Sequence, residues 1–197
     1  GSHVKADEKT GDLTKEDLFW DILESKTFVC CGCYMLRAEA FFEIYPLRRI
    51  PEYEVGQNFQ MLLPFMHVHK CPTIREKLYG VCVRQGSHSR RKRTRAEEEK
   101  KYSDYEDLVD EIAGICGLRD AVSLKRIEEW KIRRRYGLAI KYGEARKAVS
   151  LGRQLYRYGN VNIWQISRDV LYLSCVSFTE RLKNWKEKGI SKENFSD

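Results

Sequence analysis

The sequence lacks any apolar run of the roughly 20 residues that a helix needs to cross a lipid bilayer, so it predicts no membrane-spanning segment. It also lacks the composition of a disordered chain, because 42% of its residues are apolar and 33% are charged. With 197 residues, it is long enough to bury the core of one large domain or two small ones.

A disulfide framework is also missing. The seven cysteines are an odd number and are scattered along the chain. Several lie in apolar stretches, where a thiol packs as a small hydrophobic group. This pattern favours a reducing compartment, so we expect a cytoplasmic protein, with the inner face of the membrane left open as its place of work.

A zinc site is not indicated, although the sequence has two clusters of potential ligands. Structural zinc sites usually combine two Cys-x2–4-Cys knuckles, and neither cluster has a partner of that kind. The two histidines are two residues apart on an expected helix and therefore point to different sides. We expect the cysteines to be buried thiols and none of the following six residues to bind a metal: Cys30, Cys31, Cys33, His67, His69 and Cys71.

The sequence has fewer acidic than basic residues, 29 Asp and Glu against 36 Lys and Arg. The resulting net charge of +7 is concentrated in "RRKRTR" (residues 90–95) and "KIRRRY" (residues 131–136). This permits nucleic acid, acidic lipid headgroups or a nucleotide diphosphate as a partner. However, no nucleic-acid recognition motif frames either segment, and the helix that follows the first is strongly acidic. We therefore expect internal charge pairing and no nucleic acid. Peripheral contact with an anionic membrane stays open, and the apolar stretch 163–178 would then be the docking surface; the alternative for this stretch is packing in the core or in a dimer.

Three short helices are expected in the first half of the chain. The first has Thr14 as a plausible N-cap and Asp17 three residues on, the spacing of a capping box. The second should end near Pro46, because proline cannot continue a helix. The three expected helices lie within residues 13–26, 37–46 and 56–68.

Two β-forming segments alternate with these helices. The run "TFVCCGCYML" (residues 27–36) predicts a buried strand with a bend at Gly32. Residues 74–84 have partial alternation and predict extended chain. Strands alternating with short helices fit the later part of an α/β layer.

The second half is expected to be helical throughout and to form antiparallel hairpins. One helix should end at Gly117 in the manner of a glycine C-cap, and Asp120 can cap the next helix. A further helix should end at Gly159. A helical stripe marks the last segment: Leu171, Cys175, Phe178, Leu182 and Trp185.

Three motifs in this order resemble the C-terminal part of a bacterial family 2 glycosyltransferase, a nucleotide-sugar-dependent enzyme of the GT-A type. They are "CCGCYMLRAEAFFEIYP", "EYEVGQNFQMLLP" and "EKLYGVCVRQGSHSR", which together span about 60 residues. The second is commonly Gly-Glu-Asp-aromatic in the family. One branch has Gly-Gln-Asn-Trp-Gln, which is similar to residues 56–60.

The resemblance implies an α+β fold class: the C-terminal piece of a GT-A α/β layer, followed by an antiparallel helical domain. The corresponding domains are a tag and mobile lead-in at 1–13, the acceptor-side part at 14–89, a basic linker at 90–96 and the helical domain at 97–197. The complete enzyme would transfer a sugar from a nucleotide donor to a growing cell-surface glycan.

The donor-binding half of that family is absent from this sequence. There is no Asp-x-Asp motif and no glycine-rich phosphate loop. The resemblance therefore implies an inactive fragment, with magnesium or manganese needed only by the full-length enzyme and no cofactor here. Nucleotide sugar and glycan acceptor would be partners of the full-length enzyme. An exposed sheet edge would favour a homodimer.

The family places its catalytic base in the second motif, at the position of Asn58. An amide cannot accept a proton, so the resemblance implies that Glu54 or Glu52 in the preceding loop supplies the carboxylate. Gln57 and Asn58 would bind the acceptor through hydrogen bonds at a helix N-terminus. The simpler alternative is that both amides only cap and pack this helix.

The third motif provides two candidates for contact with the donor diphosphate. Arg84 would neutralise the leaving group, and His88 lies in the turn just after it. The alternatives are a surface ion pair for Arg84 and a solvent-facing turn for His88. A different function class also stays open: a non-enzymatic basic helical module that binds nucleic acid or a protein partner.

Overall fold

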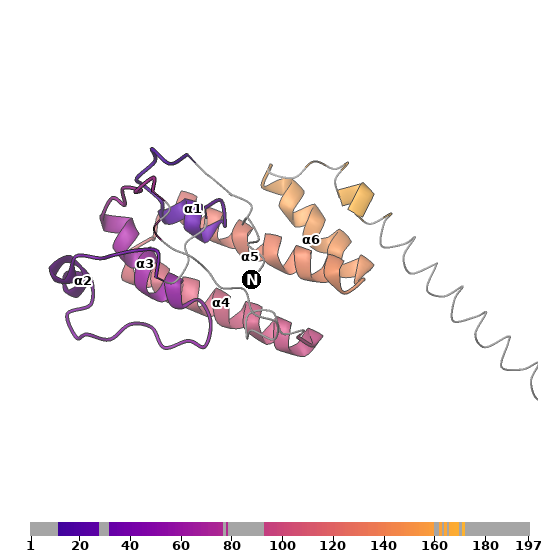
Figure 1. Cartoon of the computed structure of the whole chain (residues 1–197). Coiled ribbons are helices and arrows are strands. Elements are labelled where there is room, and N and C mark those ends of the chain that lie inside the picture. The colour runs from indigo at the N-terminus through magenta and orange to yellow at the C-terminus, as the bar shows by residue number, and fades with distance from the viewer. Residues whose placement is uncertain are drawn as a thin grey trace, which may run out of the picture. The chain divides into compact units, whose positions relative to one another are not determined.

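Most of the described residues are helical, and six helices have defined bounds. The computed structural model describes residues 12–27, 32–76, 78, 93–159, 162, 164, 166–169 and 171. The helices are α1 (Phe19–Leu23), α2 (Ala38–Ile44), α3 (Gln57–Val68), α4 (Arg95–Ile115), α5 (Ala121–Lys141) and α6 (Ala145–Arg157) (Figure 1). No strand occurs within these described ranges.

The predicted α+β fold class is therefore wrong for the residues that the structure describes. In the expected strand at 27–36, residues 32–36 are irregular, and Met35 is 93% exposed. An apolar, β-forming run becomes a strand only when another strand pairs with its backbone, and the described ranges offer none. Residues 28–31 lie outside them. In the expected extended segment at 74–84, residues 74–76 and 78 have no regular structure, and the rest lie outside the described residues.

The chain divides into two compact units, Gly1–Leu124 and Lys125–Asp197. The boundary lies in the first turns of α5 and not at the expected linker, residues 90–96. Helix α4 contacts α3 and so belongs to the same compact unit as the three helices before it.

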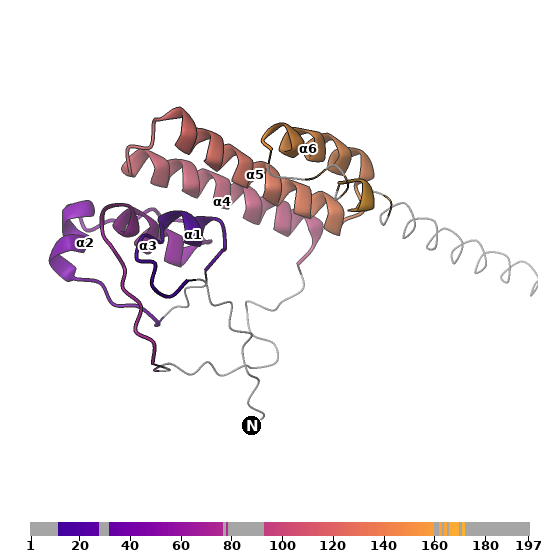
Figure 2. The same cartoon turned by 90° about the horizontal axis from the view of Figure 1, so that it is seen from above.

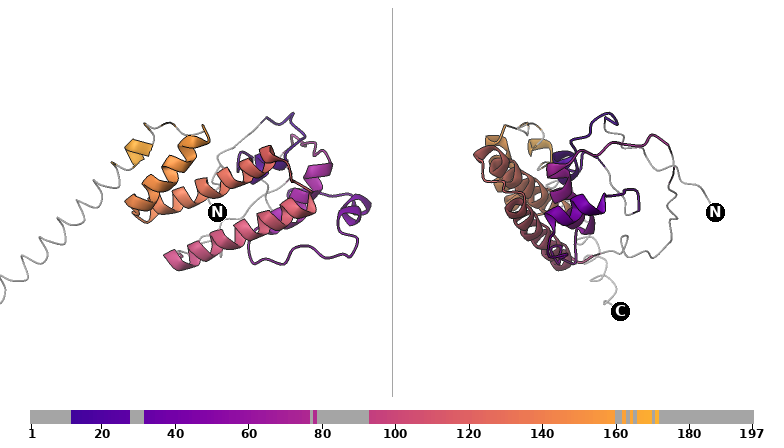
Figure 3. Two further views of the ribbon diagram at one scale, coloured as in Figure 1. Left: turned by 180° about the vertical axis from the view of Figure 1, so that it is seen from behind. Right: turned by 90° about the vertical axis from the view of Figure 1, so that its left-hand side faces the viewer.

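Helix α3 is the centre of the first unit, because it contacts α1, α2 and α4. Figures 2 and 3 show α1, α2 and α3 together on one side of α4. All five residues from Leu62 to Met66 are buried, which is expected of a helix covered on several sides. The core of this unit includes Phe19, Ile22, Leu23, Leu62, Leu63, Leu108 and Ile112.

A hydrogen bond from outside α3 replaces the one that a proline inside this helix removes. Pro64 has no N–H group, so the carbonyl oxygen of Gln60, four residues earlier, loses its usual helical donor. The hydroxyl group of Tyr45 donates to this oxygen at 2.7 Å. Tyr45 is the residue just after α2, so the bond also ties the end of α2 to α3.

In the second unit, Figure 2 shows α6 folding back along α5. A glycine turn joins them, with Gly143 at a φ of 71°. Gly152 on α6 lets the helical residue Ile166 approach, because a Cβ at this position would lie 2.8 Å from Ile166 Cγ2. The core of this unit is formed by Ile132, Tyr136, Ala139, Ala148, Leu151, Leu155 and Ile166.

The predicted helix starts and ends were partly right. Thr14 does not cap a helix: its side chain donates to Asp12, and α1 begins only at Phe19. The structure has its capping box at Thr94 and Glu97, at the start of α4. Asp120 does accept from the backbone N–H group of Ser123, as expected.

The glycine ends of the helices were predicted correctly. Gly117 has a φ of 67°, and the N–H group of Leu118 bonds back to the carbonyl oxygen of Ala113. This is the arrangement of a Schellman C-cap after α4. Gly159, with a φ of 81°, follows α6.

Candidate functional site

The turn that opens α3 is built around a glycine that no other residue could replace without strain. Gly56 has a φ of 64°, and a Cβ there would lie 2.8 Å from Leu108 Cδ2 and 2.9 Å from Tyr105 Cε1. Both neighbours belong to α4. The left-handed backbone and the close approach of α4 each require glycine, so the turn is held in one position against α4.

The loop before this turn is fixed by the buried side chain of Gln60. Its Nε2 donates to the carbonyl oxygens of Tyr53 and Val55, both at 2.8 Å. Tyr53 is also hydrogen-bonded to Glu111 of α4, and its pKa is raised by desolvation and by this carboxylate. The loop that carries the candidate acids is therefore tied to both α3 and α4.

The two amides of the turn differ in environment. Gln57 is exposed at the first position of α3, and Asn58 is half-buried beside it. The Tyr34 hydroxyl group lies 3.5 Å from Asn58 Oδ1 and 3.9 Å from Met61 Sδ. The N-cap residue is glycine and provides no side-chain cap, so the backbone N–H groups of this first turn have no capping side chain. A polar ligand oxygen could accept hydrogen bonds from them.

The two candidate acids are exposed in the loop just before the turn. Glu54 is close enough to Lys100 on α4 to help raise the pKa of that ammonium group, after the larger effects of the hydrogen bond and charge of Asp104. Lys100 itself bonds to Asp104 at 2.6 Å. Glu54 therefore lies near the amides in sequence and near a cation in space. Arg84 and His88 lie outside the described residues.

No metal centre is present among the described residues, since no group of three or more His, Cys, Asp or Glu side chains comes together there. The His67 ring packs 5.3 Å from Phe19, and the His69 ring packs 4.6 Å from Phe65. Cys33 and Cys71 are free, but Cys33 is exposed and Cys71 is half-buried, so the expectation of a buried thiol is wrong for Cys33. Cys30 and Cys31 lie outside the described ranges.

Several side chains of the basic segment 131–136 have partners within the protein. Arg133 forms an ion pair with Glu129 at 2.7 Å. The Arg134 guanidinium lies 4.6 Å from the ring centre of Trp130, and Tyr136 donates to Asp169. A dense run of arginines on one helix therefore does not make a free cationic face, because successive residues point in different directions.

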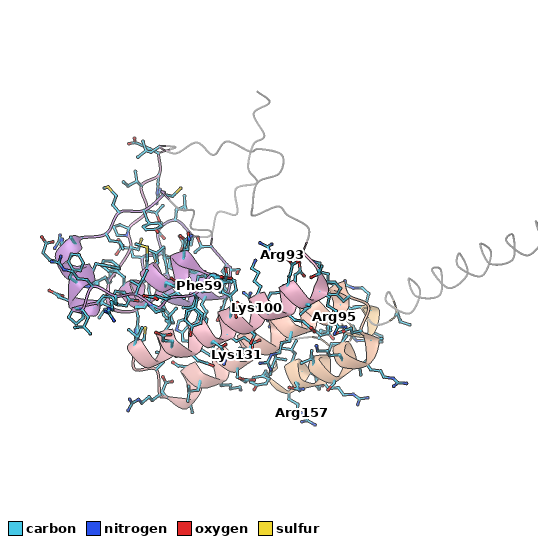
Figure 4. All side chains as sticks on the ribbon, turned by 90° about the horizontal axis from the view of Figure 1, so that it is seen from below. Phe59, Arg93, Arg95, Lys100, Lys131 and Arg157 are labelled. Atoms are coloured by element: carbon cyan, nitrogen blue, oxygen red, sulfur yellow. The ribbon has the colours of Figure 1, made fainter. Side chains whose placement is uncertain are left out.

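Two cations at the start of α4 are paired as well. Arg95 bonds to Glu99 at 3.0 Å, and Lys100 to Asp104, each four residues further along the helix. Figure 4 shows Arg93 and Arg95 at this end of α4, with Lys100 further along and Phe59 beside the helix. The Phe59 ring meets Tyr105 edge-on at 5.7 Å. Both of these pairs lie within α4, whereas the sequence suggested pairing between adjacent segments across a helix hairpin.

Comparison of the chain with models of protein families, with curated proteins and with solved structures gave no match. None of the helices in the described part of the chain has the combination of length and apolar character that a membrane span requires.

Proposed function

We propose that this chain forms the acceptor-side part of a nucleotide-sugar-dependent glycosyltransferase for cell-surface glycans, and that the turn at Gln57 and Asn58 binds the acceptor. The observation that carries this proposal is that some residues of the segment 56–60 have structural roles while others remain available to a ligand. Gly56 and Gln60 are used to build the turn. Gln57 is left facing solvent, with Asn58 half-buried next to it.

The chemistry of this turn suits a sugar. A carboxamide has both a donor and an acceptor, so it can bond to a hydroxyl group in either direction. The Tyr34 hydroxyl group and the first backbone N–H groups of α3 add further polar groups. Neither amide can accept the proton that a sugar hydroxyl loses on transfer, so we assign that role to Glu54, with Glu52 as the alternative.

The magnesium or manganese ion of such enzymes does not fit the described residues, which contain no cluster of metal ligands. The described free thiols Cys33, Cys71 and Cys116 accord with a reducing cytoplasm as the place of action.

Glycan binding by the chain itself tests this proposal. The labelled protein is applied to an array of bacterial surface oligosaccharides, together with Gln57→Ala, Asn58→Ala and the control Gln154→Ala, an exposed glutamine on α6. We expect a defined set of glycans to be bound, and each turn variant to weaken binding by about 5-fold to 100-fold, the value of one or two hydrogen bonds. Glu54→Gln should retain binding, because a base acts only in the transfer step.

Two results would contradict the proposal. One is the absence of any glycan bound above the level of an unrelated protein. The other is binding that all three alanine variants leave unchanged, since the turn would then not be the site.

A basic module that binds nucleic acid or a protein is the second candidate function. The observation in its favour is the charge of the second unit, where residues 125–197 have 17 Lys and Arg against 8 Asp and Glu. The nucleic-acid arm of the experiment described below tests it directly.

A further inference from the structure

The two units differ in net charge. Residues 1–124 have 19 Lys and Arg against 21 Asp and Glu, so the first unit is slightly acidic. The excess of 9 positive charges in residues 125–197 exceeds the net charge of +7 for the whole chain. The second unit therefore has the net positive charge that favours attraction to an anionic surface.

Three cations of helix α6 have no ion pair among the described residues. They are Arg146, Arg153 and Arg157, and all three are exposed. Lys147, by contrast, lies 3.5 Å from Glu144. Helix α6 itself has no acidic residue. These three arginines, here called the arginine stripe, are less conspicuous in the sequence than the runs at 90–95 and 131–136.

The arginine stripe runs along one side of α6. Its members are seven and four residues apart, which returns each to nearly the same side of a helix with 3.6 residues per turn. The opposite side is formed by Ala148, Leu151 and Leu155, which are buried in the core of the unit. Figure 4 shows Arg157 extending away from the ribbon. The stripe therefore faces outward over a length of about 16 Å.

We propose that the arginine stripe of α6 binds the surface of an anionic lipid bilayer. The apolar side of α6 is already packed against α5, so the helix would lie on the headgroups by charge attraction without inserting. Two exposed aromatic residues of the same unit, Tyr156 at 54% and Trp164 at 78%, are of the type that settles at a lipid–water interface.

A lipid surface fits the stripe better than a nucleic acid does. The axial separations of the three arginines are unequal, about 10 Å and about 6 Å. Headgroups diffuse and can gather around cations at any spacing, whereas phosphates on a nucleic acid are fixed along its backbone. The exposed aromatic side chains add an apolar contribution that a duplex backbone cannot use.

Vesicle binding measures the contribution of the stripe. Each arginine near an anionic membrane strengthens binding about fivefold, so three together account for about 100-fold. The full chain is sedimented with vesicles of phosphatidylcholine containing 30% phosphatidylserine, and with vesicles of phosphatidylcholine alone. The test variant is Arg146→Gln/Arg153→Gln/Arg157→Gln.

A matched control variant removes the same charge elsewhere. In Arg95→Gln/Lys100→Gln/Arg133→Gln, all three cations are ones that already form ion pairs. We expect wild type to bind the anionic vesicles and lose binding in 0.5 M salt. The stripe variant should bind about 100-fold more weakly, and the control variant should stay within a few-fold of wild type. The helical circular dichroism signal and the melting temperature of the three proteins are compared, and equal values show that all three are folded.

Three outcomes would overturn the proposal. Equal loss in both variants would make the effect one of net charge alone, and binding by the stripe variant at the wild-type level would exclude the stripe. In a parallel titration with a 20-base-pair DNA duplex and a 20-nucleotide RNA, tight stripe-dependent binding without vesicle binding would assign the stripe to nucleic acid. Because the stripe and the turn at Gln57 lie in different units, failure here leaves the glycan-binding test unaffected.

Discussion

The hydroxyl group of Tyr45 donates a 2.7 Å hydrogen bond to the carbonyl oxygen of Gln60. This oxygen would be left without its helical donor, because Pro64 stands where an N–H group is needed. The same glutamine uses its side chain to hold the loop at Tyr53 and Val55. One residue therefore links the end of α2, the interior of α3 and the loop with the candidate acids.

Tyr45→Phe should destabilise the first unit by about 1–3 kcal/mol, since it leaves a buried carbonyl oxygen without a donor. Pro64→Ala restores an N–H group to that oxygen, so Tyr45→Phe should cost less in the Pro64→Ala background. A double-mutant cycle by urea unfolding measures this coupling. Strictly additive effects would show that the two residues do not share the Gln60 oxygen.

Gly56→Ala should be more damaging than Gly117→Ala. Both glycines have positive φ values, 64° and 67°, but only Gly56 has neighbours that a Cβ would meet. Gly117→Ala should cost about 1 kcal/mol for the backbone alone. Gly56→Ala should cost about 1–3 kcal/mol more through overpacking against α4. Urea unfolding of both variants gives the difference, and equal costs would contradict the close approach of α4.

Two helical glycines should respond to alanine with opposite signs. Gly137 on α5 has no heavy atom within 4 Å of a built Cβ, whereas Gly152 on α6 meets Ile166 at 2.8 Å. Gly137→Ala should stabilise the protein by about 0.5–1 kcal/mol through helix propensity. Gly152→Ala should destabilise it by about 1–2 kcal/mol, because the clash exceeds that gain. Thermal melting distinguishes them, and a stabilised Gly152→Ala would mean that Ile166 can move away.

The second unit should lose stability at alkaline pH through Tyr136. Burial, followed by the hydrogen bond to Asp169 at 3.0 Å, raises the pKa of this phenol from 10.0 to about 12. The folded state therefore favours the protonated phenol, and this stabilisation is complete below pH 10 and lost as the pH rises to 12. Tyr136→Phe should be less stable than wild type by about 1–2 kcal/mol at pH 9.

That difference should shrink between pH 10 and pH 12, because phenylalanine does not titrate. The exposed Tyr156→Phe on α6 serves as the control and should follow the wild-type pH dependence. A gap between wild type and Tyr136→Phe that stays constant up to pH 12 would show that the Tyr136 phenol is not protected by folding.

Most helices could be predicted from the sequence, because their signals are local. Helical periodicity and glycine ends correctly indicated α2 to α6. The capping box was assigned to Thr14 and Asp17, although the same Thr-x-x-acid pattern at Thr94 and Glu97 is the one that forms. A cap needs a helix directly behind it, and α1 starts only at Phe19. The strand expected at 27–36 is wrong for the described residues 32–36, because strand formation depends on a distant pairing partner.

The candidate site was only partly predictable for the same reason. The sequence drew attention to the turn at Gln57 and Asn58, and the structure describes both at the start of α3. Gln60 was missed, because a polar residue inside an apolar helix gives no sign of which backbone atoms it will reach. The arginine stripe was missed because ion pairs, and not the local density of cations, decide which cations remain free.

Helix α3 begins in the candidate site and continues as the most deeply enclosed helix of the first unit. Occupancy and folding are consequently coupled in that unit. A ligand that bonds to the first turn of α3 would shift the folding equilibrium in proportion to the logarithm of its concentration. Stabilisation of residues 12–124 during a melt could therefore identify the natural ligand from a mixture of sugars, before any transfer reaction has been observed.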